Sequence, residues 1–212
     1  MNDNGYFITF EGIDGVGKST QIQAARALLK EHYDHGKVVV TKEPGDSAAG
    51  EMIREVVLAI DTTAMTAMTE LLLLFADRAQ HLKDVIRPAL AENKLVLCDR
   101  FTDSSYAYQG TGRGLGRENI AILESMVQDK LRPDLTVLLD APAEVALQRI
   151  KQPANLDRFE MEPDTFFEEV RQGYLAIAAA EPERVHVIDA TAEQAAVTES
   201  LRQLLQQRGL IP

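Results

Sequence analysis

The sequence has a single cysteine and no long apolar run, and both shortages narrow what the chain can be. Cys98 has no second cysteine to pair with, so an internal disulfide is excluded, and its place at the end of an apolar run predicts a buried free thiol. The longest uninterrupted apolar stretch, 71–76, is far shorter than the roughly 20 residues that a membrane-spanning helix needs. We therefore expect a cytoplasmic protein without a membrane span.

Basic residues are also in short supply. The chain has 22 Lys and Arg residues against 33 Asp and Glu residues, which gives a formal net charge of −11. Proteins that bind the phosphate backbone of nucleic acids usually show the opposite balance, so duplex DNA and anionic membranes are poor partners. Residues 1–5 carry no basic segment of the kind that opens a signal peptide. The hydrophobic fraction of 45% predicts a chain that buries a core.

Repeats, low-complexity tracts and shifts in composition are absent from the 212 residues, and a length of about 1.4 typical domains favours one domain over 1–212. Short apolar runs, which predict strands, alternate with helix-period segments. A run that is apolar throughout is typical of a strand buried on both faces. We therefore expect an α/β fold with a five-stranded parallel sheet and helices on both faces. The predicted strands cover 6–10, 38–40, 95–98, 135–139 and 185–188.

The predicted helices cover 20–32, 51–58, 68–92, 117–129, 144–150, 163–180 and 193–207. Pro88 should divide the longest of them, because a proline inside a helix removes a backbone hydrogen bond and clashes with the preceding turn. Three irregular stretches interrupt the alternation, at 42–50, 109–116 and 151–163. We expect all three to flank one site.

The clearest motif is the run GIDGVGKS at 12–19, which matches G-x-x-x-x-G-K-[S/T] in full between a predicted strand and a helix that opens at Thr20. Glycines let backbone N–H groups converge on phosphate oxygens, Lys18 can reach the outer phosphates, and the Ser19 hydroxyl can bind Mg²⁺. The alternative is a tight turn in which glycine serves only steric needs. The predicted triphosphate-binding residues are Gly12, Ile13, Asp14, Gly15, Val16, Gly17, Lys18, Ser19 and Thr20.

A second motif, Asp99-Arg100, directly follows the predicted strand 95–98. A carboxylate at the carboxyl end of such a strand lies beside the phosphate loop, where it can hold Mg²⁺ through water. Asp99 thus resembles a Walker B residue, and Arg100 beside it favours phosphate. The alternative role for Asp99 is to cap a helix that begins near Ser104. We predict Ser19 and Asp99 as the Mg²⁺ ligands.

The kind of nucleotide protein depends on residues outside the phosphate loop. A GTPase needs an Asn/Thr-Lys-x-Asp motif to read guanine, but the run TKEP at 41–44 has proline where the aspartate is required. Several planar cations suit two phosphorylated compounds held end to end, because they offset the repulsion between them. Arginines recur in or beside the irregular stretches, at Arg54, Arg78, Arg100, Arg113, Arg149 and Arg158. Any one of these arginines alone could be an ordinary surface residue.

Four runs carry a resemblance to a known family: FEGIDGVGKS at 10–19, EPG at 43–45, DRFTDSSYAYQG at 99–110 and LDRFE at 156–160. Over about 7–191 the sequence resembles bacterial thymidylate kinases. The resemblance implies a P-loop fold like that of nucleoside monophosphate kinases, with a short lid at about 150–162. It also implies direct in-line transfer of the γ-phosphoryl group of ATP to dTMP, giving dTDP and ADP in dTTP biosynthesis. Mg²⁺ and a homodimer are implied as well.

The resemblance also assigns the residues around the acceptor sugar and phosphate. Asp14 would lie near the 3′-hydroxyl, and Glu43 would belong to the network of the acceptor loop. Arg54 and Arg100 would bind the acceptor phosphate, and Tyr108 would crowd the 2′ position against ribonucleotides. An acceptor phosphate is already an oxyanion at neutral pH, so positioning and charge neutralisation suffice and no general base is needed.

Base recognition is implied for a second set of residues. Arg78 would hydrogen-bond the thymine edge, with Ser105 and Gln109 completing the contacts. The family's stacking aromatic stands four residues before this arginine, but here that position is Leu74 and the aromatic is its neighbour, Phe75. Either side chain could face the base, and the alternative for Phe75 is a place in the helix core.

The closing lid is implied to contain Arg149, Lys151 and Arg158, and Ala190 lies in the loop that would flank the adenine. Pro153 replaces one of the basic lid residues common in bacterial relatives. Our hypothesis is that Arg149 and Arg158 supply the essential cations and that Lys151 is auxiliary. The predicted catalytic residues are Lys18, Asp99, Arg100, Arg149 and Arg158.

Two departures keep other functions open. Lys42 stands where the family usually has arginine, and Asp46 stands where glycine is common, so acceptor affinity could differ. One alternative is a kinase for another monophosphate, such as dUMP, or one with broad acceptor choice. Another is a regulatory module that binds nucleotide without turnover. We interpret all four histidines as structural or surface residues: His32, His35, His81 and His186.

Overall fold

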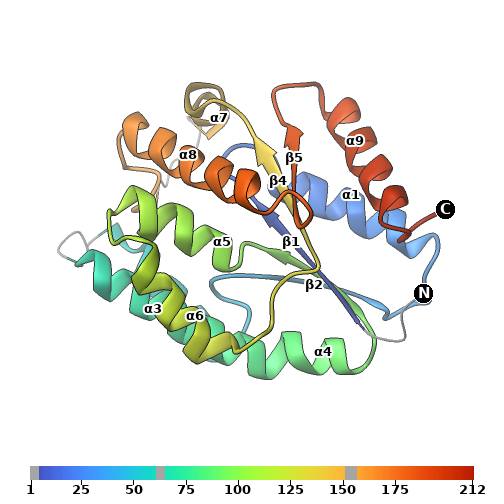
Figure 1. The fold of residues 1–212 in the computed structure, drawn as a ribbon, viewed down its shortest axis with the longest axis horizontal. Helices are drawn as coiled ribbons and strands as arrows, with labels where there is room; N and C mark the ends of the chain where they lie inside the picture. The colour runs from blue at the N-terminus through green and yellow to red at the C-terminus, as the bar shows by residue number, and fades with distance from the viewer. Residues whose placement is uncertain (1–4, 61–64, 151–156) are drawn as a thin grey trace.

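The computed structural model describes residues 5–60, 65–150 and 157–212. Five parallel strands form its sheet in the order β2-β3-β1-β4-β5 (Figure 1). This arrangement confirms the predicted α/β fold with a five-stranded parallel sheet. The strands are β1 (Tyr6–Glu11), β2 (Val38–Lys42), β3 (Leu95–Asp99), β4 (Leu135–Asp140) and β5 (Val185–Asp189).

The register of the sheet brings the ends of the strands to one edge. Asp99 at the end of β3 pairs with Phe10 on β1 and with Lys42 on β2. On the other side of β1, Asp140 at the end of β4 pairs with Asp189 at the end of β5. Loops that follow parallel strands therefore leave from the same edge, which is where open α/β sheets bind their ligands.

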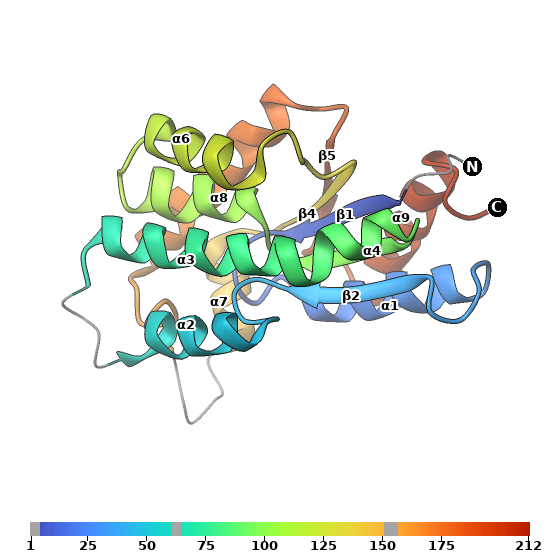
Figure 2. The same cartoon turned by 90° about the horizontal axis from the view of Figure 1, so that it is seen from below.

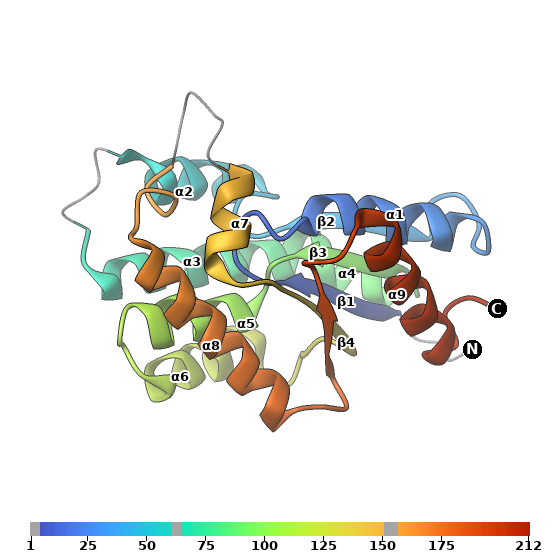
Figure 3. The ribbon, with the colours of Figure 1, turned by 90° about the horizontal axis from the view of Figure 1, so that it is seen from above.

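Helices cover both faces of the sheet. Figure 3 shows α1 and α9 on one face and α5 and α8 on the other, and α4 packs against β3. The α-helices are α1 (Lys18–Lys30), α2 (Ala48–Leu58), α3 (Ala67–His81), α4 (Arg87–Ala91), α5 (Thr102–Ser105), α6 (Arg117–Gln128), α7 (Ala143–Ile150), α8 (Asp164–Ala180) and α9 (Gln194–Gln207). Two π-helical segments complete the set, η2 (Leu82–Ile86) and η3 (Tyr106–Gly112).

Side-chain caps explain two helix starts that bear on the site. The Ser47 side chain accepts a hydrogen bond from the Gly50 backbone N–H and opens α2. The Thr66 side chain accepts one from the Thr69 backbone N–H and opens α3. Each cap satisfies a donor that the first helical turn leaves free. Figure 2 shows the two capped helices running side by side.

Several boundaries differ from the sequence prediction, among them the start of α2 at Ala48 rather than at residue 51. The helix after the phosphate loop begins at Lys18 rather than Thr20. The helix predicted over 68–92 is divided by the π-helical η2 and not at Pro88, which stands in the first turn of α4, where its missing N–H costs nothing. The stretch 109–116 is not irregular throughout, because η3 continues to Gly112. Wider turns of this kind are common at functional sites.

The core lies on both faces of the central strands, as their continuous apolar runs predict. Phe7, Val96 and Cys98 pack with η2 and α4, and every residue of β4 except Asp140 is buried. Cys98 has no exposed surface and forms no disulfide, which confirms the predicted buried thiol. Within the described ranges, the structure has no helix long and apolar enough to cross a membrane.

Candidate active site

The phosphate loop joins β1 to α1 and has a shape that only glycine permits. Gly12 has a φ of 131°, and a Cβ there would lie 2.3 Å from the carbonyl oxygen of Leu139. Gly17 has a φ of 92° and immediately precedes α1, whose N-terminus has no side-chain cap. The Lys18 ammonium lies over the loop and donates to the carbonyl oxygens of Gly12 and Ile13 at 3.1 and 2.9 Å. The uncapped N–H groups of α1 can therefore bind an anion.

A cavity runs from this loop across the ends of the strands. It brings together Ser19 and Asp99, predicted for Mg²⁺, with most of the predicted triphosphate residues, and Arg149 joins them from the last turn of α7. Gly12, Ile13 and Val16 do not line it, and the side chains of Ile13 and Val16 are buried in the core. Arg149 Nη1 donates to the Ala190 carbonyl oxygen at 3.0 Å, so the two residues predicted at the nucleotide edge meet. The cavity is lined by Asp14, Gly15, Gly17, Lys18, Ser19, Thr20, Lys42, Glu43, Arg54, Asp99, Arg100 and Arg149.

A second cavity opens beside the first, with both apolar and charged side chains in its walls. Four residues, Asp14, Glu43, Arg54 and Arg100, line both cavities. The two spaces therefore meet at two carboxylates and two guanidinium groups. The second cavity is also lined by Pro44, Val57, Leu58, Leu74, Asp77, Arg78, Phe101, Ser104, Ser105, Tyr108, Gln109, Asp157 and Phe159.

Arg100 stands at the junction in a strained backbone conformation. Its φ is 66°, a region that L-residues other than glycine seldom adopt, and its N–H donates to the Phe10 carbonyl oxygen at 3.0 Å. The side chain turns back over the phosphate loop, where Nη2 lies 2.5 Å from Asp14 Oδ1 and 3.1 Å from the Tyr108 hydroxyl. Burial opposes ionisation of Asp14, but Arg100 and Lys18 outweigh it and hold the pKa of that carboxyl well below its usual range.

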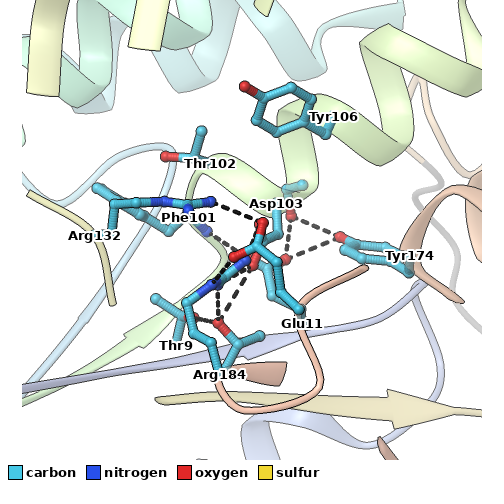
Figure 4. Close-up of polar contacts among 12 residues, drawn as sticks. Thr9, Glu11, Phe101, Thr102, Asp103, Tyr106, Arg132, Tyr174 and Arg184 are labelled. Atoms are coloured by element: carbon cyan, nitrogen blue, oxygen red, sulfur yellow. Dashed lines mark hydrogen bonds and ion pairs between the residues drawn. The ribbon is translucent and has the colours of Figure 1, made fainter. Parts of the chain in front are cut away.

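A buried network around Glu11 supports Arg100 from behind, and Figure 4 shows Glu11 with its partners Phe101 and Tyr174. Arg100 Nη1 donates to the Tyr174 hydroxyl at 3.1 Å and to Ser104 Oγ at 3.3 Å. Both hydroxyl groups donate in turn to Glu11 Oε2, at 3.0 and 2.6 Å, and the Phe101 N–H donates to Glu11 Oε1 at 2.7 Å. Burial and the nearby Asp103 carboxylate raise the pKa of Glu11. The arginine is therefore held by groups that are themselves fixed.

Arg78 lies on α3 with its guanidinium in a closely defined position. Nε donates to Glu43 Oε2 at 2.7 Å, and Nη1 donates to Ser105 Oγ at 3.2 Å. The guanidinium carbon is 4.6 Å from the ring centroid of Phe75, which is buried and is not among the described residues that line the cavity. Leu74 lines it instead. Phe75 thus packs behind the arginine, which corresponds to the core alternative for this residue.

The acceptor loop after β2 is fixed from α2 and α3. Arg54 Nη1 donates to the Pro44 carbonyl oxygen at 2.9 Å, and the Gly45 N–H donates to Asp77 Oδ1 at 3.1 Å. Burial and the Glu43 carboxylate raise the pKa of Asp77 to about 6. His81 Nδ1 lies 2.9 Å from Glu43 Oε1. His81 is therefore structural, as predicted, and it is a buried partner of a predicted site residue.

Arg158 takes a different place from the other predicted cations. Its Nη2 lies 2.6 Å from Glu70 Oε2, and its Nε donates to the Val57 carbonyl oxygen at 3.0 Å. It is buried and lines neither cavity, although its neighbours Asp157 and Phe159 line the second one. The predicted lid residues Lys151 and Pro153 lie outside the described residues.

Ser19 and Asp99 share the cavity beside the phosphate loop, as predicted for Mg²⁺ ligands. Asp99 Oδ1 is buried and has no hydrogen-bond partner within the described part of the chain. The capping alternative does not apply, because α5 begins at Thr102 after Phe101 and without a side-chain cap. Among those residues no group of three or more His, Cys, Asp and Glu side chains could hold a metal alone. The donor set fits Mg²⁺, which keeps waters and binds substrate phosphates with one or two protein oxygens.

Comparison with known proteins agrees with this geometry. The thymidylate kinase family model matches residues 10–201. The chain is 54% identical over 202 residues to the thymidylate kinase of Pseudomonas entomophila strain L48, which covers 95% of each chain. It is 52% identical over 203 residues to that of Pseudomonas savastanoi pv. phaseolicola, covering 96% of each.

The chain belongs to the thymidylate kinase family. Its activity is the phosphorylation of dTMP to dTDP with ATP, a step of dTTP biosynthesis. The fold is also similar to the crystal structure of thymidylate kinase from Ehrlichia chaffeensis, with a TM-score of 0.77 and 34% identity over 95% of this chain and 98% of that one. The predicted kinase activity is confirmed, so the regulatory-module and other-acceptor alternatives are set aside.

The thymidylate kinase site also uses residues that sequence reasoning missed. These side chains are buried or nearly so and act on the predicted residues from behind: Glu11, Glu70, Asp77, Ser104 and Tyr174. One signal was available on α3, where positions 70, 74, 77, 78 and 81 fall on one helical face. Four of these five positions carry polar side chains in an otherwise apolar stretch. A polar stripe on a buried face marks a network rather than a solvated surface.

Proposed function

We propose that ATP and dTMP occupy the two cavities and exchange the phosphoryl group where the cavities meet. The triphosphate binds the loop 12–20 through its backbone N–H groups and Lys18, and the adenine lies at the edge formed by Arg149 and Ala190. The observation that carries the proposal is the shared lining: Asp14, Glu43, Arg54 and Arg100 belong to both spaces. An acceptor phosphate at that junction lies in line with an outer phosphate on the loop.

Transfer in this arrangement depends on position and charge. Arg54 and Arg100 bind the acceptor phosphate and offset its repulsion with the incoming phosphoryl group. Lys18, Asp99, Arg100 and Arg149 line the cavity at the phosphate loop and are the catalytic residues of the proposal, with Lys18 at the transferring group. Arg158 joins them only if it leaves Glu70 during turnover. The positions of Asp14 and Tyr108 support their proposed contacts with the sugar, since their side chains meet at 3.1 Å beside Arg100.

The base is recognised at the far end of the second cavity. Arg78 and Ser105 face each other there at 3.2 Å, and Gln109 lies one turn further along η3. Leu74 and Phe159 supply apolar walls, whereas Phe75 contributes by packing under Arg78. We therefore assign the thymine edge to Arg78, Ser105 and Gln109.

We further propose that Mg²⁺ accompanies ATP, held through Ser19 and Asp99 together with phosphate oxygens. The ion would neutralise charge on the outer phosphates when bound. The support is the buried Asp99 Oδ1 atom, which has no partner among the described residues and lies in the same cavity as Ser19.

The remaining proposals concern the whole chain. We propose that residues 1–212 act as one P-loop kinase domain with a lid at about 150–162. We place the enzyme in the cytoplasm, where ATP is supplied and where a free thiol such as Cys98 stays reduced. A homodimer is supported by exposed apolar side chains on the neighbouring helices α3 and α6, namely Met68, Leu72, Ile122 and Met126.

The test is ADP release from ATP and Mg²⁺ with dTMP, dUMP, dCMP, dAMP, dGMP and UMP offered one at a time. We expect strong preference for dTMP, because base and sugar are both recognised in the second cavity. Lys18→Ala should abolish turnover, since the contact with the transferring phosphate is lost. Circular dichroism should show that the chain still folds without the Lys18 hydrogen bonds to the Gly12 and Ile13 carbonyl oxygens. Equal rates with all acceptors, or retained turnover in K18A, would contradict the assigned sites.

A further inference from the structure

Glu70 on α3 is a buried carboxylate behind the wall of the second cavity, which is the proposed dTMP site and is called the acceptor cavity below. It is 1% exposed and is not among the described residues that line either cavity. Gln109 Nε2 donates to Glu70 Oε1 at 2.7 Å, and Arg158 Nη2 donates to Glu70 Oε2 at 2.6 Å. Arg113 Nη2 lies 3.3 Å from Oε2. A carboxylate paired with two guanidinium groups offers acceptors only.

This contact decides which end of the Gln109 amide is free. The oxygen and nitrogen ends of a glutamine amide are told apart by their partners rather than by shape. An acceptor-only carboxylate can be faced only by the NH₂ group, so the amide must keep its oxygen for another partner. Gln109 Oε1 is buried and has no hydrogen-bond partner in the described ranges. Buried acceptors in native proteins are nearly always paired, so this atom suits an incoming N–H donor.

The free oxygen lies next to fixed donors. Gln109 lines the acceptor cavity together with Arg78 and Ser105, and the Arg78 guanidinium supplies N–H groups. A donor and an acceptor side by side match a base edge with a carbonyl group beside a ring N–H, as in thymine, uracil and guanine. Cytosine and adenine present the reverse, an amino group beside an unprotonated ring nitrogen.

We propose that Glu70 is a positioning residue for base choice: by holding the amino end of the Gln109 amide, it reserves the oxygen for the ring N–H of thymine. The inference rests on the proposed placement of dTMP beside Arg78 and Gln109. Glu70 itself touches no substrate and acts through Gln109.

The experiment compares kcat/KM for dTMP and dCMP in the wild type and in E70Q, with inhibition of dTMP phosphorylation by dCMP as a second measure. The new amide at position 70 can donate or accept, so Gln109 can turn either end toward the base. We expect the dTMP to dCMP ratio to fall about ten-fold, the size of one lost hydrogen-bond preference. A role that is only structural would lower both activities alike, and an unchanged ratio in folded E70Q would overturn the proposal.

Three further variants separate the possible outcomes. Glu162→Gln removes the other carboxylate of Arg113, 2.5 Å from Nη1, without touching the amide, and should leave the ratio unchanged. E70Q/Q109E exchanges the carboxylate and the amide between the two positions. The amide at position 70 then donates to the carboxylate at position 109, and we expect the dTMP to dCMP ratio to recover. If E70Q does not fold, the double variant is used for the test instead. A dTMP to dCMP ratio in E70Q/Q109E as low as that in Q109L would then contradict the proposed role of Glu70.

Gln109→Leu tests the assumption that thymine binds beside Gln109. If Q109L keeps the wild-type ratio, thymine does not lie beside Gln109 and the proposed base site is wrong. If Q109L lowers the ratio and E70Q does not, the base site stands and only the role of Glu70 fails.

Discussion

At the scale of single residues, the site depends on buried charges that are held by partners, and Asp77 makes this measurable. Its pKa is raised to about 6, so the folded chain binds this proton more tightly than the unfolded chain does. The stabilisation is therefore complete below about pH 4 and is lost as the pH rises through 6. Between pH 5 and pH 8 we expect the free energy of unfolding of the wild type to fall by about 1 to 2 kcal/mol more than that of D77N, measured by urea denaturation.

Asp77→Asn is a suitable comparison because its side-chain oxygen can still accept the Gly45 N–H. Other titrating groups are common to both proteins and cancel in the difference. Parallel pH profiles for the two proteins would show that the pKa of Asp77 is not raised by folding.

The two arginines near the lid give a second prediction at this scale. Arg149 lines the phosphate cavity, whereas Arg158 is paired with Glu70 away from it. We expect Arg149→Ala to lower kcat by at least about ten-fold, since a charge that offsets the transferring phosphates is lost. If Arg158 also moves to the phosphates during turnover, R158A lowers kcat to a similar degree. Wild-type kcat in both variants would show that our lid hypothesis is wrong.

At the scale of elements, α8 sets the position of η3, which carries Tyr108 and Gln109. A Cβ at Gly173 would lie 2.8 Å from Thr111 Oγ1 and 3.1 Å from the Cα of Ala107. Gly173→Val should therefore push the two helices apart. We expect a loss of about 1 to 3 kcal/mol in the free energy of unfolding and a raised KM for dTMP. The matched control is Ala176→Val on the exposed side of α8, and equal effects of the two variants would count against the close approach.

At the scale of the whole molecule, the exposed apolar side chains of α3 and α6 predict an interface between two copies. Ile122 and Met126 are 62% and 74% exposed, and Leu72 is 50% exposed. Light scattering should give twice the chain mass for the wild type. In I122E/M126E, dimerisation would bring the introduced carboxylates of the two copies together across the two-fold axis and remove them from water. We therefore expect this variant to be a monomer. Val187→Glu, on the edge strand β5, should remain dimeric, and a monomeric wild type would remove the interface.

The sequence by itself determined the five strands and most of the helices, because short apolar runs and helical periods are local properties of the chain. It also determined the chemistry of the phosphate loop, since Gly12, Gly17 and Lys18 are required by backbone shape and charge within one turn. The runs at 10–19, 43–45, 99–110 and 156–160 together indicated the family. Arg78, Arg100 and Gln109 could be named as candidates because of that resemblance.

Only the tertiary structure decided which atoms these candidates face. Glu11 and Tyr174 are separated by 163 positions and meet behind Arg100, and Glu70 meets Arg158 across 88 positions. No local pattern encodes such pairs, because they arise from the order of the strands and the packing of α3, η3 and α8 around one sheet edge. The same packing turned Leu74 toward the second cavity and placed Phe75 under Arg78. Helical periodicity could not tell which of these two adjacent apolar residues faces the cavity.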